Sequence, residues 1–143
     1  MKLQVASQLA IFSILELVAE PNRQITVADI GAKYGISTNH LAKVMNVLGR
    51  AGLVRSVRGA GGGFQFSGNA RRTTLLDIIE LFEPRGLRGP ETGELGRHTA
   101  EAAALGVVLR EIDDTVRATL GSITIATLRD LATRQRAKAV LAT

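Results

Sequence analysis

Residues 30–76 of this chain contain no aspartate and no glutamate. The same stretch carries seven basic residues, which are Lys33, Lys43, Arg50, Arg55, Arg58, Arg71 and Arg72. Positive charge without interspersed negative charge attracts a polyanion, because each cation adds to the local field instead of being cancelled. The pattern therefore predicts a nucleic-acid-binding surface, and double-stranded DNA is the expected partner.

Part of this stretch has polar residues at the spacing of one helix face. They are Asn39, Lys43, Asn46 and Arg50, at i, i+4, i+7 and i+11, with His40 beside them. Amides and cations are the side chains that read base edges and hold adjoining phosphates. An ordinary solvated face is the alternative, but such faces usually carry acidic residues as well. The spacing therefore favours a recognition helix, with Thr38 and the N–H groups at the helix start expected to hold a phosphate.

A glycine-rich segment, Arg58-Gly59-Ala60-Gly61-Gly62-Gly63-Phe64, lies in the same stretch. The G-x-G-x-x-G pattern of nucleotide-binding loops fails at its last position, where Phe64 stands, and there is no P-loop Lys-Ser/Thr. Glycines also let a backbone turn sharply and approach DNA phosphates closely. We therefore expect this tip to contact DNA in or beside the minor groove. The residues expected to do so are Arg55, Arg58, Gly59, Gly61 and Gly62.

Three helices are needed to position these groups. Residues 3–19 predict a helix that is apolar on nearly every face, and such a helix belongs in the middle of a core or an interface. Thr26 and Asp29 begin a second helix with a capping-box pattern, and Gly35 ends it. A third helix runs from a cap at Ser37 or Thr38 to about Ala51. The second and third helices, joined by a short turn, predict a helix-turn-helix. The apolar face of the third helix is Leu41, Val44, Met45 and Leu48.

Two short apolar runs, residues 53–57 and 64–66, flank the glycine-rich tip and predict a β-hairpin. A hairpin placed directly after a helix-turn-helix is a wing. The expected fold class is therefore mainly α with a small β-wing, that is, a winged helix-turn-helix followed by a long C-terminal dimerisation helix.

The second half of the chain is predicted to be helical. Thr73 or Thr74 caps a helix to Glu83, a Pro- and Gly-rich loop follows, and a long helix covers residues 99–120 until Gly121 stops it. A last helix covers residues 124–138. So small a chain cannot cover both the long helix and the apolar first helix, so we expect an apolar stripe to be buried between two copies. The stripe is Leu105, Val108, Leu109, Ile112, Val116 and Leu120.

Composition limits the classes of function. The chain has 143 residues, is 45% hydrophobic and has a net charge of +5, which suits one domain with an appended element. It has no cysteine, and its two histidines, His40 and His98, are too few for an ordinary zinc site. These counts argue against disulfides, thiolate-bound metals and a catalytic site. The N-terminal segment has neither a signal-peptide nor a membrane-span pattern, so a cytoplasmic, nucleoid-associated protein is expected.

At these residues the chain resembles the Rrf2-type bacterial transcription regulators. The matching segments span nearly the whole sequence and are residues 1–4, 36–44, 48–54, 57–64 and 122–126. The run Ser37-Thr38-Asn39-His40-Leu41-Ala42-Lys43 looks most like the nitric-oxide-sensing repressor branch. The resemblance implies a homodimer in which the long helix of each subunit crosses onto its partner. It also implies two winged units that read a palindromic operator, and repression is the expected outcome.

Many regulators of this type hold an iron–sulfur cluster through cysteines that would fall at about residues 91–105 here. This chain has none, and residues 99–104 are rich in alanine. It is either a cysteine-free member or one whose cluster cysteines were replaced. His98 is a surviving ligand or a surface histidine, and a cluster without any thiolate would be unusual. We expect no metal and no cofactor in this chain.

The expected organisation has three parts: a winged helix-turn-helix domain at residues 1–83, a loop at 84–98, which is the sensor region in relatives, and dimerisation helices at 99–143. Two alternatives stand beside a dimeric, sequence-specific DNA-binding regulator. One is an iron–sulfur-sensing regulator with replaced cysteines. The other is a winged-helix protein-interaction module, which would need an apolar or mixed-charge exposed face. The acid-free stretch argues against that module.

Overall fold

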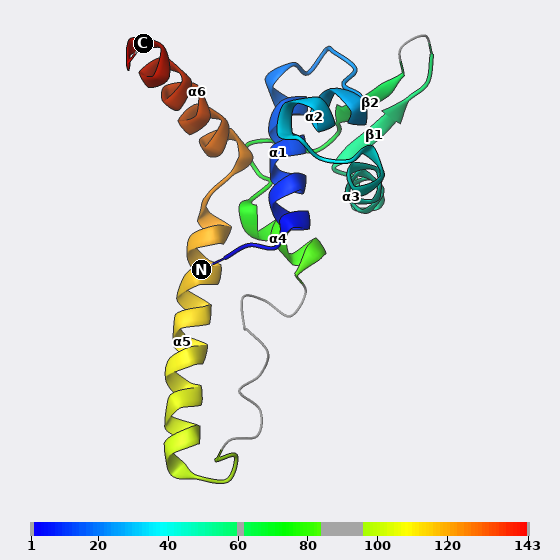
Figure 1. Cartoon of the computed structure of the whole chain (residues 1–143). Helices are drawn as coiled ribbons and strands as arrows, with labels where there is room; N and C mark the ends of the chain where they lie inside the picture. Colours follow the sequence, from blue (N-terminus) through cyan, green and yellow to red (C-terminus); the bar gives the residue numbers. More distant parts are fainter. Residues whose placement is uncertain (1, 60–61, 84–95, 143) are drawn as a thin grey trace.

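The computed structural model describes residues 2–59, 62–83 and 96–142 (Figure 1). These residues form helices and one antiparallel hairpin, so the predicted mainly helical fold with a small wing is confirmed. The elements in chain order are α1 (Val5–Ala19), α2 (Val27–Tyr34), α3 (Thr38–Arg50), β1 (Val54–Val57), β2 (Gly63–Phe66), α4 (Leu75–Phe82), α5 (Ala100–Ser122) and α6 (Ile125–Ala142).

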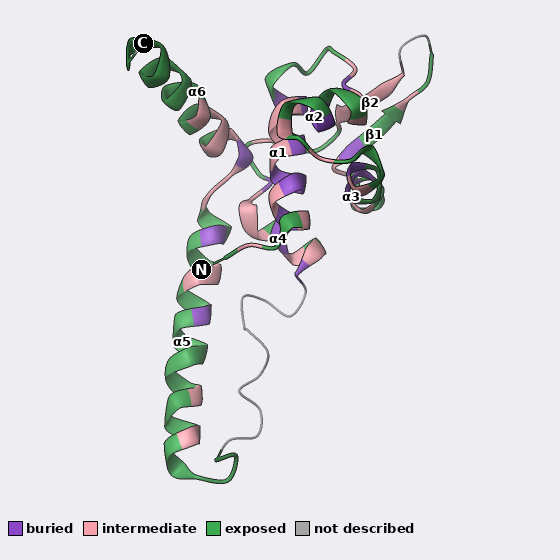
Figure 2. Cartoon of the chain, viewed as in Figure 1, coloured by how far each residue is buried: buried purple, intermediate pink, exposed green. Residues whose placement is uncertain are grey.

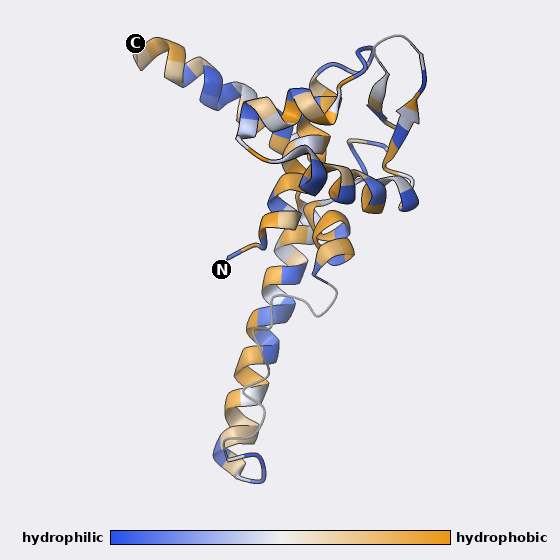
Figure 3. Cartoon of the chain, turned by 45° about the vertical axis from the view of Figure 1, so that its right-hand side comes forward, coloured by the Kyte–Doolittle hydropathy of each residue, from blue (hydrophilic) through white to orange (hydrophobic). Residues whose placement is uncertain are grey.

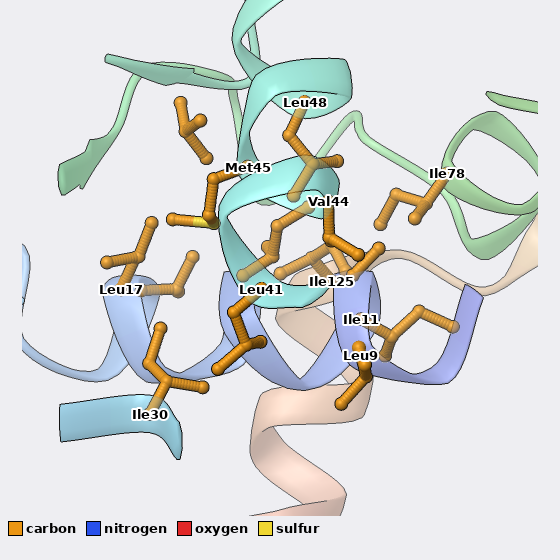
Figure 4. Packing of buried hydrophobic residues seen from close by; sticks show 14 of the residues in the cluster. Leu9, Ile11, Leu17, Ile30, Leu41, Val44, Met45, Leu48, Ile78 and Ile125 are labelled. Atoms are coloured by element: carbon orange, nitrogen blue, oxygen red, sulfur yellow. The ribbon is translucent and has the colours of Figure 1, made fainter. Parts of the chain in front are cut away.

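Helix α1 occupies the centre of the core, as its apolar composition predicts. It contacts α3, α4, β2 and α6, and its Ile14 is fully buried. The predicted apolar face of α3 lies against α1 (Figure 4). Ile78 of α4 and Ile125 of α6 are completely buried in the same cluster. The helix-turn-helix is therefore held to the rest of the chain by one continuous apolar core.

Two capping boxes begin helices at the predicted threonines. The Thr26 hydroxyl accepts a hydrogen bond from the Asp29 N–H at 3.1 Å, and the Asp29 carboxylate accepts one from the Thr26 N–H at 3.1 Å. Thr74 and Asp77 repeat this arrangement at the start of α4. Each box satisfies N–H groups that the first helical turn leaves without a partner. Thr74, rather than Thr73, is thus the cap of α4.

A backbone bridge joins the two halves of the chain. Thr74 pairs with Thr124 in an antiparallel bridge. On its two sides the Leu75 N–H donates to the Ile123 carbonyl, and the Ile125 N–H donates to the Thr73 carbonyl, each at 2.9 Å. The junction between α5 and α6 is therefore fastened to the segment that connects the wing to α4.

Several predicted helix boundaries are wrong by a few residues. Gly121 does not stop α5, which continues to Ser122 and ends where Ile123 becomes extended in the backbone bridge. The bridge, rather than the weak helix propensity of glycine, therefore sets this end. Helix α1 begins at Val5 instead of Leu3, α4 ends at Phe82, and α6 continues to Ala142. In α4 the buried residues are Ile78 and Ile79, whereas Leu75 and Phe82 are only half-buried.

Helices α5 and α6 extend away from the winged domain in different directions (Figure 1). Most of both helices is exposed (Figure 2). Within the described residues, no helix is both long and apolar enough to span a membrane. Residues 84–95, the larger part of the predicted loop, lie outside the described residues.

Candidate nucleic-acid interface

The turn between α2 and α3 is built on two glycines. Gly35 has φ 67°, a left-handed conformation that side chains disfavour, and it ends α2 as predicted. Gly31 lies so close to the next segment that a β-carbon would stand 2.7 Å from the Ile36 carbonyl oxygen. The Ser37 hydroxyl then caps α3 by accepting from the His40 N–H at 3.3 Å. Ser37 is therefore the cap, and Thr38 is the first helical residue.

The two faces of α3 separate as the sequence predicts. Leu41, Val44, Met45 and Leu48 are buried, each at most 2% exposed. The opposite side carries the candidate base- and phosphate-contacting residues, of which all except the half-buried His40 are exposed. The exposed members are Thr38, Asn39, Lys43, Asn46 and Arg50. A helix held to the core by one face and free on the other has the geometry that major-groove reading requires.

The wing starts directly from α3, since the Leu53 N–H donates to the Leu48 carbonyl at 3.0 Å. Strands β1 and β2 pair in a register that places Arg55 opposite Gln65, and the Arg55 guanidinium donates to the Gln65 amide oxygen at 2.8 Å. Arg58 and Gly59 are exposed beyond the strands, and Gly59 has φ 130°. The sequence alone did not single out Gln65, because its contact with Arg55 can be recognised only once the strand register is known.

The tip glycines have unequal roles. A β-carbon on Gly62 would stand 2.9 Å from the Val57 carbonyl oxygen, whereas one on Gly59 would meet nothing within 4 Å. Glycine is thus required at 62 by close packing and at 59 by its backbone conformation. Gly61, the remaining predicted contact, lies outside the described residues.

A third backbone segment steadies the wing. Ile25, in the loop between α1 and α2, exchanges two hydrogen bonds with Phe64, its N–H donating at 3.2 Å and its carbonyl accepting at 2.9 Å. Strand β2 is therefore bonded on both edges. The sequence does not signal this contact, because one apolar residue before a helix cap has many explanations.

The basic residues of the acid-free stretch, residues 30–76, do not all lie on α3 and the wing. Lys33 contacts Glu16 of α1, with Nζ 2.5 Å from Oε1, and also lies over the Tyr34 ring. The ammonium group of Lys33 is therefore paired within the domain, between α2 and α1. Arg71 and Arg72 are exposed in a turn whose Ala70 carbonyl accepts from the Ala126 N–H of α6. The candidate interface thus rests on α3 and the wing, and Lys33 is not part of it.

Glu16 is held ionised at this contact. Burial alone would raise the pKa of its carboxyl, but hydrogen bonds from Lys33 and Tyr34, with the charges of Lys33 and Arg136, lower the pKa below its usual value. Burial and the same carboxylate raise the pKa of Tyr34, so its hydroxyl remains a donor. The contact fixes α2 on α1, and so supports the helix-turn-helix.

The apolar stripe on α5 divides into two parts. Leu120 is 7% exposed and Val116 is half-buried, and both pack in the core of the subunit itself. The outer part is exposed, by 44% to 55%, and consists of Leu105, Val108, Leu109 and Ile112. Figure 3 shows apolar colour along α5 in the region that Figure 2 shows as exposed. Only this outer part is available to a second subunit, so Leu120 is better assigned to the subunit core.

The residues do not fit an iron–sulfur cluster. The sequence has no thiolate donor at all, and thiolates are the usual ligands of such clusters. His98 and Glu101 are both exposed at the start of α5. Among the described residues no three His, Asp or Glu side chains gather in a way that could hold a metal ion. Glu91 and Glu94 lie outside those residues.

The sequence is similar to those of known transcriptional regulators. Residues 3–131 match the Rrf2 family, described as iron-dependent transcriptional regulators. The chain is 46% identical over 138 residues to BadM of Rhodopseudomonas palustris, whose name gives it as a helix-turn-helix-type transcriptional regulator. That alignment covers 96% of this chain and 87% of BadM.

Solved structures show the same fold. The oxidised form of Staphylococcus aureus CymR superposes with a TM-score of 0.71 at 27% identity, covering 90% of this chain and 96% of CymR. IscR of T. potens superposes with a TM-score of 0.73 at 24% identity, covering 92% and 88% of the two chains. The winged helix-turn-helix fold of this chain is thus shared with both of these structures. By family match, by identity to BadM and by fold, the chain belongs to the Rrf2 family of transcriptional regulators.

Proposed function

We propose that this protein is a dimeric, sequence-specific repressor that binds a palindromic operator. In this proposal α3 enters the major groove, and the wing reaches the adjacent minor groove or its phosphates. Asn39, His40, Lys43, Asn46 and Arg50 would face the major groove or its flanking phosphates. Repression follows if the operator overlaps a promoter, because the bound dimer then blocks it.

One observation carries the proposal: the side of α3 that faces away from the core is exposed and has no acidic residue along its whole length. The wing that follows adds Arg55 and Arg58 on the same continuous segment. A winged-helix module that binds another protein would need an apolar or mixed-charge exposed face, and this face of α3 is neither. Such a set of cations and amides instead matches the chemistry of a DNA groove.

The exposed part of the α5 stripe supports the dimer. The four large aliphatic side chains of this part of the stripe are each exposed by 44% or more, and they lie on one helix that extends from the domain. A contiguous exposed apolar surface of this kind marks an interaction site. A second α5 packed against the first would cover these residues and give the two-fold symmetry that a palindromic operator requires.

We further propose that the protein works without an iron–sulfur cluster. The lack of thiolates and the exposure of His98 and Glu101 support this. The family description as iron-dependent therefore does not transfer to this chain on the residues present.

The operator can be obtained by selection from random duplex DNA with the wild-type protein. Binding to the selected duplex is then measured over a range of salt concentrations. A palindromic selected site and a steep fall of affinity with salt are expected, because several phosphates are neutralised. Selection of no preferred sequence, or a flat salt dependence, would contradict the proposal. A reporter with this site in its promoter decides between repression and activation.

A further inference from the structure

The outward face of the wing carries a pair of side chains that are held together. Because side chains alternate along a strand, Val54, Phe64 and Phe66 share the face that packs on the core, and Arg55 and Gln65 share the opposite face. The Arg55 guanidinium donates to the Gln65 amide oxygen at 2.8 Å. Among the described residues no carboxylate forms an ion pair with Arg55. The guanidinium is thus fixed in place while keeping its full charge.

The chemistry of the pair determines how Gln65 is turned. A guanidinium has only donors, so the amide of Gln65 must present its oxygen to Arg55. Its NH₂ group then points away from the arginine and can donate elsewhere. The pair therefore offers the free guanidinium N–H groups and an adjacent amide N–H side by side. Several donors with one positive charge are suited to a phosphate group.

The position of the pair indicates that this phosphate group would belong to a DNA strand. Along the chain Arg55 lies between Arg50, in the last turn of α3, and Arg58, at the wing tip, and Gln65 faces Arg55 from the neighbouring strand β2. If α3 lies in a major groove and the tip reaches the neighbouring minor groove, one sugar–phosphate strand must pass between them. Arg55 lies on β1, which covers this interval, and Gln65 lies opposite it on β2.

We infer that Arg55 and Gln65 form a phosphate clamp for the DNA strand that separates the two grooves. Gln65 is a positioning residue: it holds the guanidinium without neutralising it and adds a donor of its own. This inference rests on the proposed function, because it needs α3 and the wing to face DNA. It adds a residue, Gln65, that is neither basic nor part of α3.

The test uses the full-length protein and a labelled duplex of fixed, arbitrary sequence, because phosphate contacts do not depend on base sequence. Affinity is measured as a function of salt for Arg55→Ala, Gln65→Ala and the double variant. Arg55→Ala should weaken binding by roughly tenfold and reduce the salt slope by about 1. If Gln65 positions Arg55, the loss caused by Arg55→Ala should be at least about threefold smaller when Gln65 is already alanine.

Gln65→Glu separates positioning from simple packing. A carboxylate would still hold the guanidinium, but it would cancel its charge and repel the phosphate, so this variant should bind more weakly than Gln65→Ala. Gln135→Ala on the exposed part of α6 is the matched control and should bind as wild type. Thermal unfolding of each variant verifies that the hairpin remains folded.

Two results would overturn the clamp: strictly additive effects of Arg55→Ala and Gln65→Ala, or Gln65→Glu binding as well as Gln65→Ala. Lys43→Ala and Arg58→Ala in the same assay distinguish this failure from a wider one. If these weaken binding while the pair is additive, only the clamp is wrong. If neither weakens binding, the DNA-binding surface itself is misplaced.

Discussion

The backbone of Gly63 lies directly against the backbone of Ile25. A β-carbon on Gly63 would stand 2.7 Å from the carbonyl oxygen of Ile25 and 2.9 Å from its carbonyl carbon. Backbone atoms cannot swing aside as a side chain can. This close approach is what allows Ile25 and Phe64 to exchange hydrogen bonds, so the seating of the wing depends on the absence of a side chain at 63.

Gly63→Ala should therefore destabilise the protein by about 1–3 kcal/mol, the usual cost of forcing an extra carbon into a packed site. Denaturant unfolding measures the change. Gly49→Ala is the matched control, because a β-carbon there would have its nearest contact at 3.9 Å and would lie within α3. It should stabilise by roughly 0.5–1 kcal/mol, since alanine suits a helix interior better than glycine. Equal effects at the two positions would contradict the steric argument.

Lys43→Ala and Arg50→Ala should affect DNA binding in different ways. If Lys43 contacts only phosphate, its loss weakens binding uniformly across sequences and lowers the salt slope by about 1. Arg50→Ala, and Asn39→Ala with it, should instead alter base preference by about 1–3 kcal/mol for each base edge contacted. Binding to a set of operator variants measures both. Lys138→Ala removes the same charge from exposed α6 and should leave the preference and the affinity unchanged.

Leu109→Asp should separate the subunits without unfolding them. The side chain is 44% exposed within the subunit, so a carboxylate there remains hydrated until a partner covers it. Sedimentation should show a folded monomer for this variant and a dimer for wild type. Ala118→Asp, an exposed position on the far side of α5, should remain dimeric.

Leu120→Asp makes the complementary test. Leu120 is only 7% exposed and packs in the core, so an aspartate there should unfold the subunit at a cost of several kcal/mol. Circular dichroism distinguishes this from loss of the dimer. A stable wild-type monomer at micromolar concentration would contradict the assignment of the exposed stripe.

Acid sensitivity should depend on Glu16. Its pKa is lower in the folded protein than the usual value of about 4.3 expected for the unfolded chain. The stabilisation is therefore complete above that value and is lost as pH falls through the lower folded pKa. Glu16→Gln should lose less stability than wild type between about pH 5 and pH 3. Thermal unfolding across this range measures it, with Glu20→Gln at the exposed end of α1 as control. Parallel curves for wild type and Glu16→Gln would contradict the prediction.

Anaerobically purified protein should show no visible iron–sulfur absorption and no stoichiometric iron. Its DNA affinity should not change with nitric oxide, peroxide or iron chelators, because no thiolate is present to react. A coloured protein with bound iron would show that other ligands serve, and His98, Glu91, Glu94 and Glu101 would be the first to replace.

The winged half of the fold could be predicted because its signals are local. The capping box at Thr26, the helix-ending Gly35 and the 3.6-residue period of α3 each act within a few residues. The contacts of Ile25 with Phe64, and of Thr74 with Thr124, could not be predicted in the same way. They are made by backbone groups distant in sequence, which every residue possesses.

The candidate site shows the same division. Periodicity correctly placed Lys43 and Asn46 on the exposed side of α3. It also placed Leu109 and Leu120 on one stripe, but it could not show that the subunit itself covers Leu120 and leaves Leu109 exposed. Gln65 was missed because a glutamine in a short strand has no distinguishing pattern until its cross-strand neighbour is known.

The backbone bridge at Thr124 anchors the root of α5, its C-terminal end, while the rest of the helix extends away from the domain. Its 23 residues extend for about 35 Å at 1.5 Å per residue. One degree of rotation at the root then displaces the far end by roughly 0.6 Å over a helix of that length. A shift of a few ångströms near Ala100 therefore corresponds to a rotation of only a few degrees at Thr124, where the bridge joins this helix to the segment between the wing and α4. Because a single helix is stiff, a displacement of its Ala100 end is coupled to a small rotation at its Ser122 end.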